Sequence, residues 1–351
     1  MNKKSFRPRF LNILTLFVLY FLCNAPIFAQ QTFESLESLS KQLMSLPDTQ
    51  KCGERDEPLR LTKEIVEKYG DVKDDAVLYF KKRLPEFEKE ERTCKLFIRY
   101  NNDYRTKNWK DFFDIASLIL NEERDTGIAL DVLLDLVSVG FHRAYDHWDD
   151  TYNKLTYHYA SQAIFQIASG QTSQTGQWGI LESFKSKENA LGWLNFISGW
   201  HQYYKRDGRM QSVFSLYQAT QYEGDKEKDS LAYELIGDYY FKAAVDGLGL
   251  INKKLDAKRV EMIRTGIKDY TERALLAYAK VYQIEISEEL KDKRYEAVYK
   301  KIVDAYRFRF NIPENEEPDG LENIYLILVK QPLPAPDKKI VWVFPNPFVK
   351  E

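Results

Sequence analysis

Proline is absent from the middle of this chain: none occurs between Pro85 and Pro313, whereas seven of the twelve prolines lie within residues 313–351. Because proline breaks the interior of a helix, its absence favours one helix after another. Apolar residues recur there at helical spacing, and no alternating strand pattern occurs before Ile340–Phe344. The sequence therefore predicts an all-α domain followed by an extended, proline-rich tail over residues 311–351.

Long apolar runs are also absent, except near the N-terminus. There a basic start precedes the apolar stretch Leu11–Cys23, and the small residues Ala25 and Ala29 follow it. This order is typical of a secretory signal peptide, and the stretch is shorter than the roughly 20 residues that a membrane span needs. We expect residues 1–29 to be removed on export, leaving a periplasmic or secreted protein without a membrane span. A retained anchor helix is the alternative.

Cysteine is scarce, with three residues in the whole chain. Cys23 lies within the predicted signal peptide, so Cys52 and Cys94 remain in the mature protein. An even number of cysteines in an oxidising compartment is typical of disulfide bonding. We expect a disulfide between Cys52 and Cys94, with two unpaired cysteines as the alternative.

The chain also has no excess of positive charge, because it contains 51 Lys and Arg residues and 53 Asp and Glu residues. Nucleic-acid binding needs a clustered basic face, so it is not expected. No metal-ligand, phosphate-loop or nucleophile motif is present. His142 and Asp146 share a helix face, but we expect no metal ion, no cofactor and no catalysis. Gly247 and Gly249 are expected to end a helix at Asp246.

Helical periodicity separates the chain into many short blocks. The predicted helices lie near residues 32–46, 58–70, 73–84, 88–104, 109–122, 127–146, 152–169, 188–205, 209–223, 229–246, 257–283 and 287–308. A loop without periodicity is predicted at residues 169–179.

Two kinds of spacing recur among these helices. The pattern W-x2-L-G-x2-Y is matched by Tyr233-Ile236-Gly237-Tyr240 and, with isoleucine in place of glycine, by Trp193-Phe196-Ile197-Trp200. A small residue followed by apolar ones occurs in Ala160-Ile164-Ile167, Ser212-Leu216-Ala219 and Ala274-Tyr278-Val281, and Phe112-Ala116-Ile119 fits this spacing more loosely. In this order the chain resembles the tetratricopeptide-repeat family, with residues 247–270 as an insertion in the last repeat.

The resemblance implies an open solenoid of antiparallel helix pairs over residues 91–310, preceded by a helical region at residues 30–90. In that family the first helix of each pair lines a concave groove. The corresponding groove residues here are His201, Gln202, Glu234, Asp238 and Lys242. Some of the adjacent tyrosines, Tyr203-Tyr204 and Tyr239-Tyr240, are expected to face outward.

The sequence thus predicts an exported scaffold that binds a protein or peptide partner in the cell envelope. A glycan-active enzyme or glycan-binding protein on an α/α toroid is the alternative, since that fold is also helical and rich in aromatic residues. A purely structural envelope protein without a groove is a third possibility. A toroid closes on itself, whereas a solenoid leaves open ends.

Overall fold

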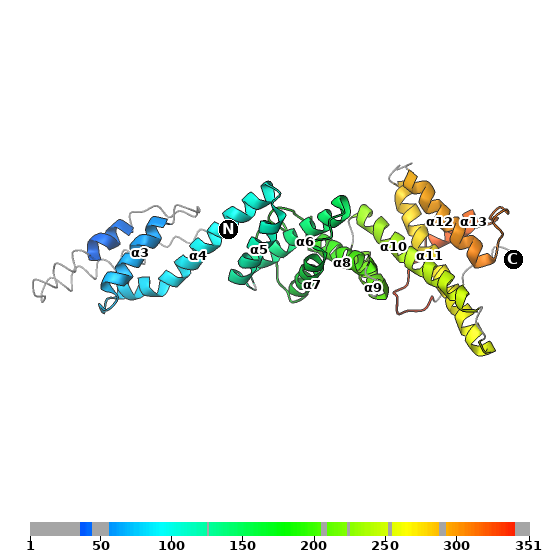
Figure 1. The fold of residues 1–351 in the computed structure, drawn as a ribbon, viewed down its shortest axis with the longest axis horizontal. Helices are drawn as coiled ribbons and strands as arrows, with labels where there is room; N and C mark the ends of the chain where they lie inside the picture. The colour runs from blue at the N-terminus through cyan, green and yellow to red at the C-terminus, as the bar shows by residue number, and fades with distance from the viewer. Residues whose placement is uncertain are drawn as a thin grey trace, which may run out of the picture. The chain divides into compact units, whose positions relative to one another are not determined.

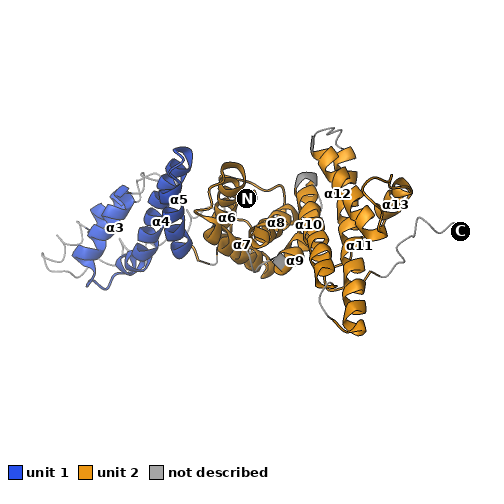
Figure 2. Ribbon diagram, turned by 45° about the vertical axis from the view of Figure 1, so that its right-hand side comes forward, with its two compact units in different colours: residues 1–122 blue, residues 123–351 orange. Residues whose placement is uncertain are grey.

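The computed structural model of the chain describes residues 36–43, 56–124, 126–204, 209–222, 225–251, 255–287 and 293–340. Every regular element in these ranges is an α-helix and none is a strand, which confirms the all-α prediction (Figure 1). The predicted signal peptide, Cys52 and the apolar segment Val341–Phe344 lie outside the described residues. The chain divides into two compact units, unit 1 (residues 1–122) and unit 2 (residues 123–351) (Figure 2).

Unit 1 contains α3 (Asp56–Tyr69), α4 (Asp75–Arg105) and α5 (Trp109–Glu122), and residues 36–43 are helical as well. α4 begins where the buried Asp74 carboxylate accepts hydrogen bonds from the N–H groups of Ala76 and Val77. Such a cap satisfies donors that have no partner within the helix. Towards the other end of α4, the fully buried Tyr100 ring stacks on Phe112 of α5 at 4.7 Å between ring centroids.

α4 continues through Pro85, and this corrects the predicted end of one helix at residue 84 and start of another at residue 88. A proline inside a helix removes one backbone hydrogen bond. α4 nevertheless has a buried contact on each side of the proline, through Phe80 in the core shared with α3 and through Tyr100 against α5. This packing outweighs the lost bond, and the predicted boundary between residues 90 and 91 falls inside the helix.

Unit 2 contains the remaining labelled helices. They are α6 (Gly127–His147), α7 (Asn153–Ala168), α8 (Lys187–Tyr204), α9 (Arg209–Ala219), α10 (Lys226–Ile251), α11 (Ala257–Ser287), α12 (Lys293–Phe310) and α13 (Leu321–Leu328). From α6 to α12 each helix packs on the next one along the chain, and α6 also packs on α8 and α8 on α10. The main contacts therefore join near neighbours in the sequence.

Glycine marks the crossing of three successive helix pairs in unit 2. The facing residues are Gly140 with Thr156, Gly199 with Leu216, and Gly237 with Tyr278. A Cβ atom at Gly199, for example, would lie 2.7 Å from Cγ of Leu216, which is closer than real contacts allow. The Gly237 contact joins two residues of the predicted repeat patterns. In α8 the residue that lies close to α9 is Gly199. The repeat pattern instead places its glycine position at Ile197, two residues earlier.

The end of α10, which precedes α11 in the chain, lies further along the sequence than predicted. α10 extends to Ile251, so Gly247 and Gly249 lie inside it instead of ending it at Asp246. A Cβ atom at Gly247 would lie 3.0 Å from Cγ1 of Ile267, so this glycine allows α11 to approach closely. Residues 247–251 and 257–270 therefore belong to two packed helices, α10 and α11.

The C-terminal region contains α13, a short helix within residues 311–351, the segment that the sequence predicts to be mostly irregular. The buried side chains of α13 are Leu321, Ile324 and Leu328. Their spacing gives this short helix one apolar face. Residues 332–340 follow without helix, and the Arg273 guanidinium of α11 donates hydrogen bonds to the backbone carbonyls of Ala335 and Lys338.

Candidate binding surface

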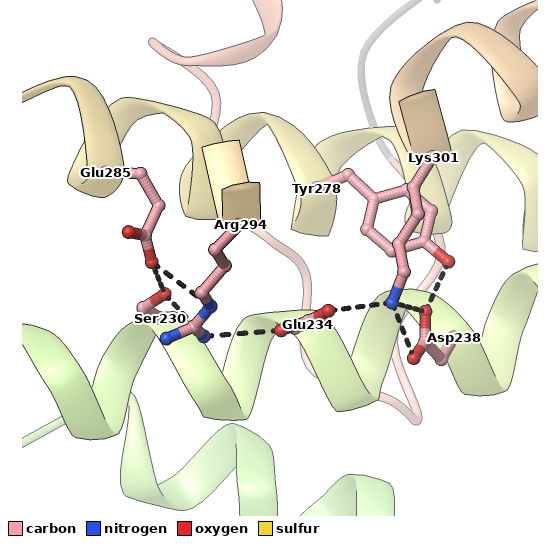
Figure 3. A network of polar contacts seen from close by, with 7 residues as sticks. All are labelled: Ser230, Glu234, Asp238, Tyr278, Glu285, Arg294 and Lys301. Atoms are coloured by element: carbon pink, nitrogen blue, oxygen red, sulfur yellow. Dashed lines mark hydrogen bonds and ion pairs between the residues drawn. The ribbon is translucent and has the colours of Figure 1, made fainter. Parts of the chain in front are cut away.

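A network of charged side chains joins α10, α11 and α12 (Figure 3). Glu234 and Asp238 are four residues apart on α10 and therefore share one face. Lys301 of α12 donates hydrogen bonds from Nζ to Oε1 of Glu234 at 2.8 Å and to both Asp238 carboxylate oxygens at 2.8 and 2.9 Å. Arg294, two turns earlier in α12, reaches Oε2 of Glu234 at 3.2 Å.

α11 supplies the remaining members of this polar network. The Tyr278 hydroxyl donates a hydrogen bond to Oδ1 of Asp238 at 2.8 Å. The buried Glu285 carboxylate accepts a hydrogen bond from Ser230 and lies 3.6 Å from Nε of Arg294. We use the term polar network for the set of residues drawn in Figure 3: Ser230, Glu234, Asp238, Tyr278, Glu285, Arg294 and Lys301.

Burial and charge act in opposite directions on Lys301. Burial lowers its pKa, but hydrogen bonds to Asp238 and Glu234 outweigh burial, and the pKa is raised above its usual value. Burial is the main cause that raises the pKa of Tyr278 well above its usual range, with the Asp238 charge adding to it. Lys301 is thus held as a cation between two carboxylates.

Three aromatic side chains, which we call the aromatic row, lie beside this network: Tyr145 of α6 with Trp200 and Tyr204 of α8. The ring centroids of Trp200 and Tyr204 are 4.9 Å apart, and those of Tyr145 and Trp200 are 6.1 Å apart. The buried Phe141 ring supports both helices, stacking on Tyr145 and meeting Trp200 edge-on. Tyr204 is 63% exposed and Tyr145 is 38% exposed, so the two tyrosines of the row face solvent, whereas Trp200 is half-buried.

Electrostatics connect the aromatic row to the polar network. Burial raises the pKa of Tyr204, and the charges of Asp238 and Glu234 raise it further. Tyr204 is therefore within electrostatic range of the carboxylates of α10. The row and the network together form one candidate binding surface, to which α6, α8, α10, α11 and α12 contribute.

The five predicted groove residues lie in different environments. Glu234 and Asp238 meet in the polar network, bonded to Lys301. His201 is 4% exposed and is therefore buried, not on an open groove. Gln202 is half-buried and donates a hydrogen bond to the Tyr157 hydroxyl at 2.8 Å.

The fifth predicted residue, Lys242, is exposed and pairs with Asp246 at 3.2 Å, one turn along the same helix. The sequence did not indicate Arg294 or Lys301, because their partners lie about 60 residues away in the chain. It did indicate that one of the Tyr203-Tyr204 pair faces outward, and Tyr204 confirms this.

A second polar feature is the loop between α7 and α8, which is held by two carboxylates of α6. Asp131 accepts hydrogen bonds from the backbone N–H groups of Gln174 and Thr175, both at 3.0 Å. Asp131 and Asp135 are both fully buried. Neither residue was indicated by the sequence, since aspartates on a helix are usually exposed.

Asp135 makes the larger set of contacts with this loop. Its Oδ1 accepts hydrogen bonds from the N–H groups of Ile180, Leu181 and Glu182, each at 3.0 Å. Gly179, with φ 139°, turns the chain so that these consecutive amides point at one carboxylate. The loop predicted at residues 169–179 is confirmed as non-helical, and buried charge fixes its path.

The described residues offer neither a metal site nor a membrane-spanning helix. Among them, no three His, Cys, Asp or Glu side chains are grouped so that they could hold a metal ion. His142 and Asp146 share a helix face as predicted, with Nδ1 and Oδ2 2.9 Å apart. None of the described helices is long and apolar enough to cross a membrane.

No protein-family model, no curated protein and no solved structure matches this chain. The geometry and charge of its own residues therefore carry the functional inference.

Proposed function

We propose that this protein is an exported helical-repeat scaffold that binds a protein or peptide partner in the cell envelope, without catalysis. The observation that carries the proposal is the aromatic row, Tyr145, Trp200 and Tyr204, beside the polar network. Tyrosine and tryptophan are enriched among the residues that dominate protein interfaces. The row lies on buried rings and therefore loses little conformational freedom when a partner binds.

An open, tetratricopeptide-like solenoid is part of the proposal. It is supported within unit 2 by packing between helices that are near neighbours in the chain. The glycine contacts at three successive helix pairs add to this support, because a repeated close crossing is what such repeats need. In a toroid, helices from the two ends of the chain would pack on each other.

The polar network favours binding over catalysis. Glu234 and Asp238 are bonded to Lys301, and Asp238 also to Tyr278. A substrate would have to displace these donors before either carboxylate could act as an acid or base. The exposed Tyr204 ring, by contrast, is available to a partner without such displacement.

Export and a disulfide between Cys52 and Cys94 are further parts of the proposal. Export is supported by the basic start, apolar stretch and small residues of the first 29 positions. N-terminal sequencing of the exported protein should give Gln30 as the first residue. A chain that keeps Met1 in a membrane fraction would contradict cleavage.

Peptide selection tests the binding surface directly. A displayed peptide library is selected on the mature protein, and the enriched peptides are titrated against the wild type, Tyr204→Ala and Phe165→Ala. Phe165 is a suitable control because it is 71% exposed on α7. We expect Tyr204→Ala to weaken binding about 30-fold, as for the loss of a strong interface residue, and Phe165→Ala to have little effect. Equal losses in both variants would contradict the assignment.

Glycan binding is the second candidate, favoured by the same exposed rings next to polar groups, an arrangement that also suits a sugar. A glycan array probed with the wild type and Tyr204→Ala distinguishes the two. Binding of an oligosaccharide by the wild type and its loss in Tyr204→Ala would replace the peptide proposal with this one.

A further inference from the structure

Trp148, the residue that follows α6, is 91% exposed, more than any other large apolar residue that the structure describes. Its backbone adopts the left-handed conformation, with φ 55° and ψ 28°. Glycine usually occupies this position at the end of a helix, and a bulky side chain there is strained. The chain thus holds a tryptophan in solvent at a position where glycine would suit the isolated protein better.

The backbone around Trp148 is held firmly. Its N–H and the N–H of Asp149 both donate to the carbonyl of Arg143. The Arg143 guanidinium returns two hydrogen bonds to Oδ2 of Asp149, at 2.7 and 3.1 Å. Oδ1 of Asp149 accepts the N–H of Thr151 at 3.1 Å. Trp148 therefore projects from a fixed turn.

The surroundings of Trp148 are acidic. Asp146 and Asp150 are exposed on either side of it in the sequence, and the positive charge of Arg143 is bound to Asp149. Within residues 142–150, the other side chains that can carry positive charge are His142, 2.9 Å from Asp146, and the exposed His147, so carboxylates outnumber permanent cations in this segment. This charge repels an anionic lipid surface and complements a basic one. Tyr145, a member of the aromatic row, lies one helical turn before Trp148 on α6.

We infer that Trp148 is an anchor for a folded protein that offers an apolar socket rimmed by basic side chains. The inference rests on the proposed function and specifies the class of partner. A projecting side chain needs a concave acceptor, which a short extended peptide does not provide. A buried aromatic side chain removes about 150–250 Å² from water, and tryptophan is the residue type most often found at such anchors.

Photo-crosslinking in the cells that produce the protein identifies the partner. The crosslinking amino acid p-benzoyl-phenylalanine replaces Trp148 in one variant and the exposed Phe165 in the control. We expect position 148 to give a discrete adduct with another protein that position 165 does not give. A self-adduct, a lipid adduct or no adduct from position 148 would overturn the inference.

The crosslinked protein is then purified and titrated against the wild type, Trp148→Gly and Tyr204→Ala. We expect Trp148→Gly to raise the melting temperature by about 2 °C or more, because it relieves backbone strain, and to weaken binding at least about tenfold. A lower melting temperature or an unchanged Kd for Trp148→Gly overturns the inference. If Tyr204→Ala alone weakens binding, the proposed function stands and the anchor does not; if neither variant does, both fail.

Discussion

Glycine at the helix crossings sets how closely neighbouring helices approach. A methyl group at Gly237 would overlap the Tyr278 ring of α11, and both residues are buried. We expect Gly237→Ala to lower the unfolding free energy by about 1–3 kcal/mol, because overpacking forces the helices apart. Urea denaturation followed by circular dichroism measures this change.

Gly266 is the matched control, since it lies inside α11 with no neighbouring atom within 4 Å of an added Cβ. Alanine has the higher helix propensity, so Gly266→Ala should raise the unfolding free energy by about 0.5–1 kcal/mol. Two variants with the same sign would show that space at the crossing is not what matters.

The ionisation of Asp149 makes the stability of the turn after α6 depend on pH. Hydrogen bonds from Thr151 and Arg143 lower its pKa to about 2. The folded-state pKa lies below the unfolded value of about 3.9, so the carboxylate stabilises the fold above pH 4. That contribution is lost as the pH falls from about 4 to about 2.

Arg143→Gln should accordingly lower the unfolding free energy at pH 7 by at most about 1 kcal/mol, since the pair is partly exposed. The difference between the wild type and the variant should shrink as the pH falls towards 2. Denaturation curves between pH 2 and 7 measure it. A difference that stays constant over this range would show that Asp149 does not respond to Arg143.

At the scale of elements, the loop between α7 and α8 depends on α6. Asp135→Asn keeps one oxygen acceptor but removes the charge that holds three consecutive amides. We expect a loss of about 1.5–3 kcal/mol, the magnitude for hydrogen bonds to a charged group, and faster hydrogen exchange at Ile180, Leu181 and Glu182. Asp114→Asn, at an exposed position of α5, is the control. Protected loop amides in Asp135→Asn would refute this role.

The helices themselves were largely predictable, because their limits follow from the period of apolar residues. α5 begins and ends where predicted, α6 differs by one residue at its end, and α7 and α8 differ by one residue at each end. Two of the errors occur where tertiary packing overrides a local signal. Pro85 and Gly247 both disfavour a helix, yet contacts with neighbouring helices keep α4 and α10 continuous.

The candidate binding surface was predictable only in part. Spacing along α10 placed Glu234 and Asp238 on one face, but nothing in the sequence pairs them with Lys301, 63 residues beyond Asp238. The same limit applies to the buried Asp131, whose partners lie more than 40 residues away in a loop. Pairings across such distances depend on how helices pack, which periodicity does not specify.

At the scale of the whole molecule, the disulfide prediction concerns two cysteines 42 positions apart; Cys94 lies in α4. Closing a loop of this length stabilises a protein by about 4 kcal/mol in the chain-entropy model. We expect a reductant to lower the unfolding free energy by about 4 kcal/mol.

Mass spectrometry of the non-reduced protein should show the disulfide bond. The double variant Cys52→Ser/Cys94→Ser should not respond to reductant, and two free thiols in freshly exported protein would contradict the pairing.

The packing of each helix of unit 2 on its near neighbours has a consequence for cooperativity. If unit 2 is a solenoid, as proposed, its ends should fray while its middle persists, and loss of structure should spread one hairpin at a time. Short sequence separations also favour fast zippering during synthesis. A melting curve from one probe therefore reports the hairpin that carries it. Tryptophan fluorescence, to which Trp193 and Trp200 of α8 contribute two of six indole rings, should not coincide with the loss of total helix.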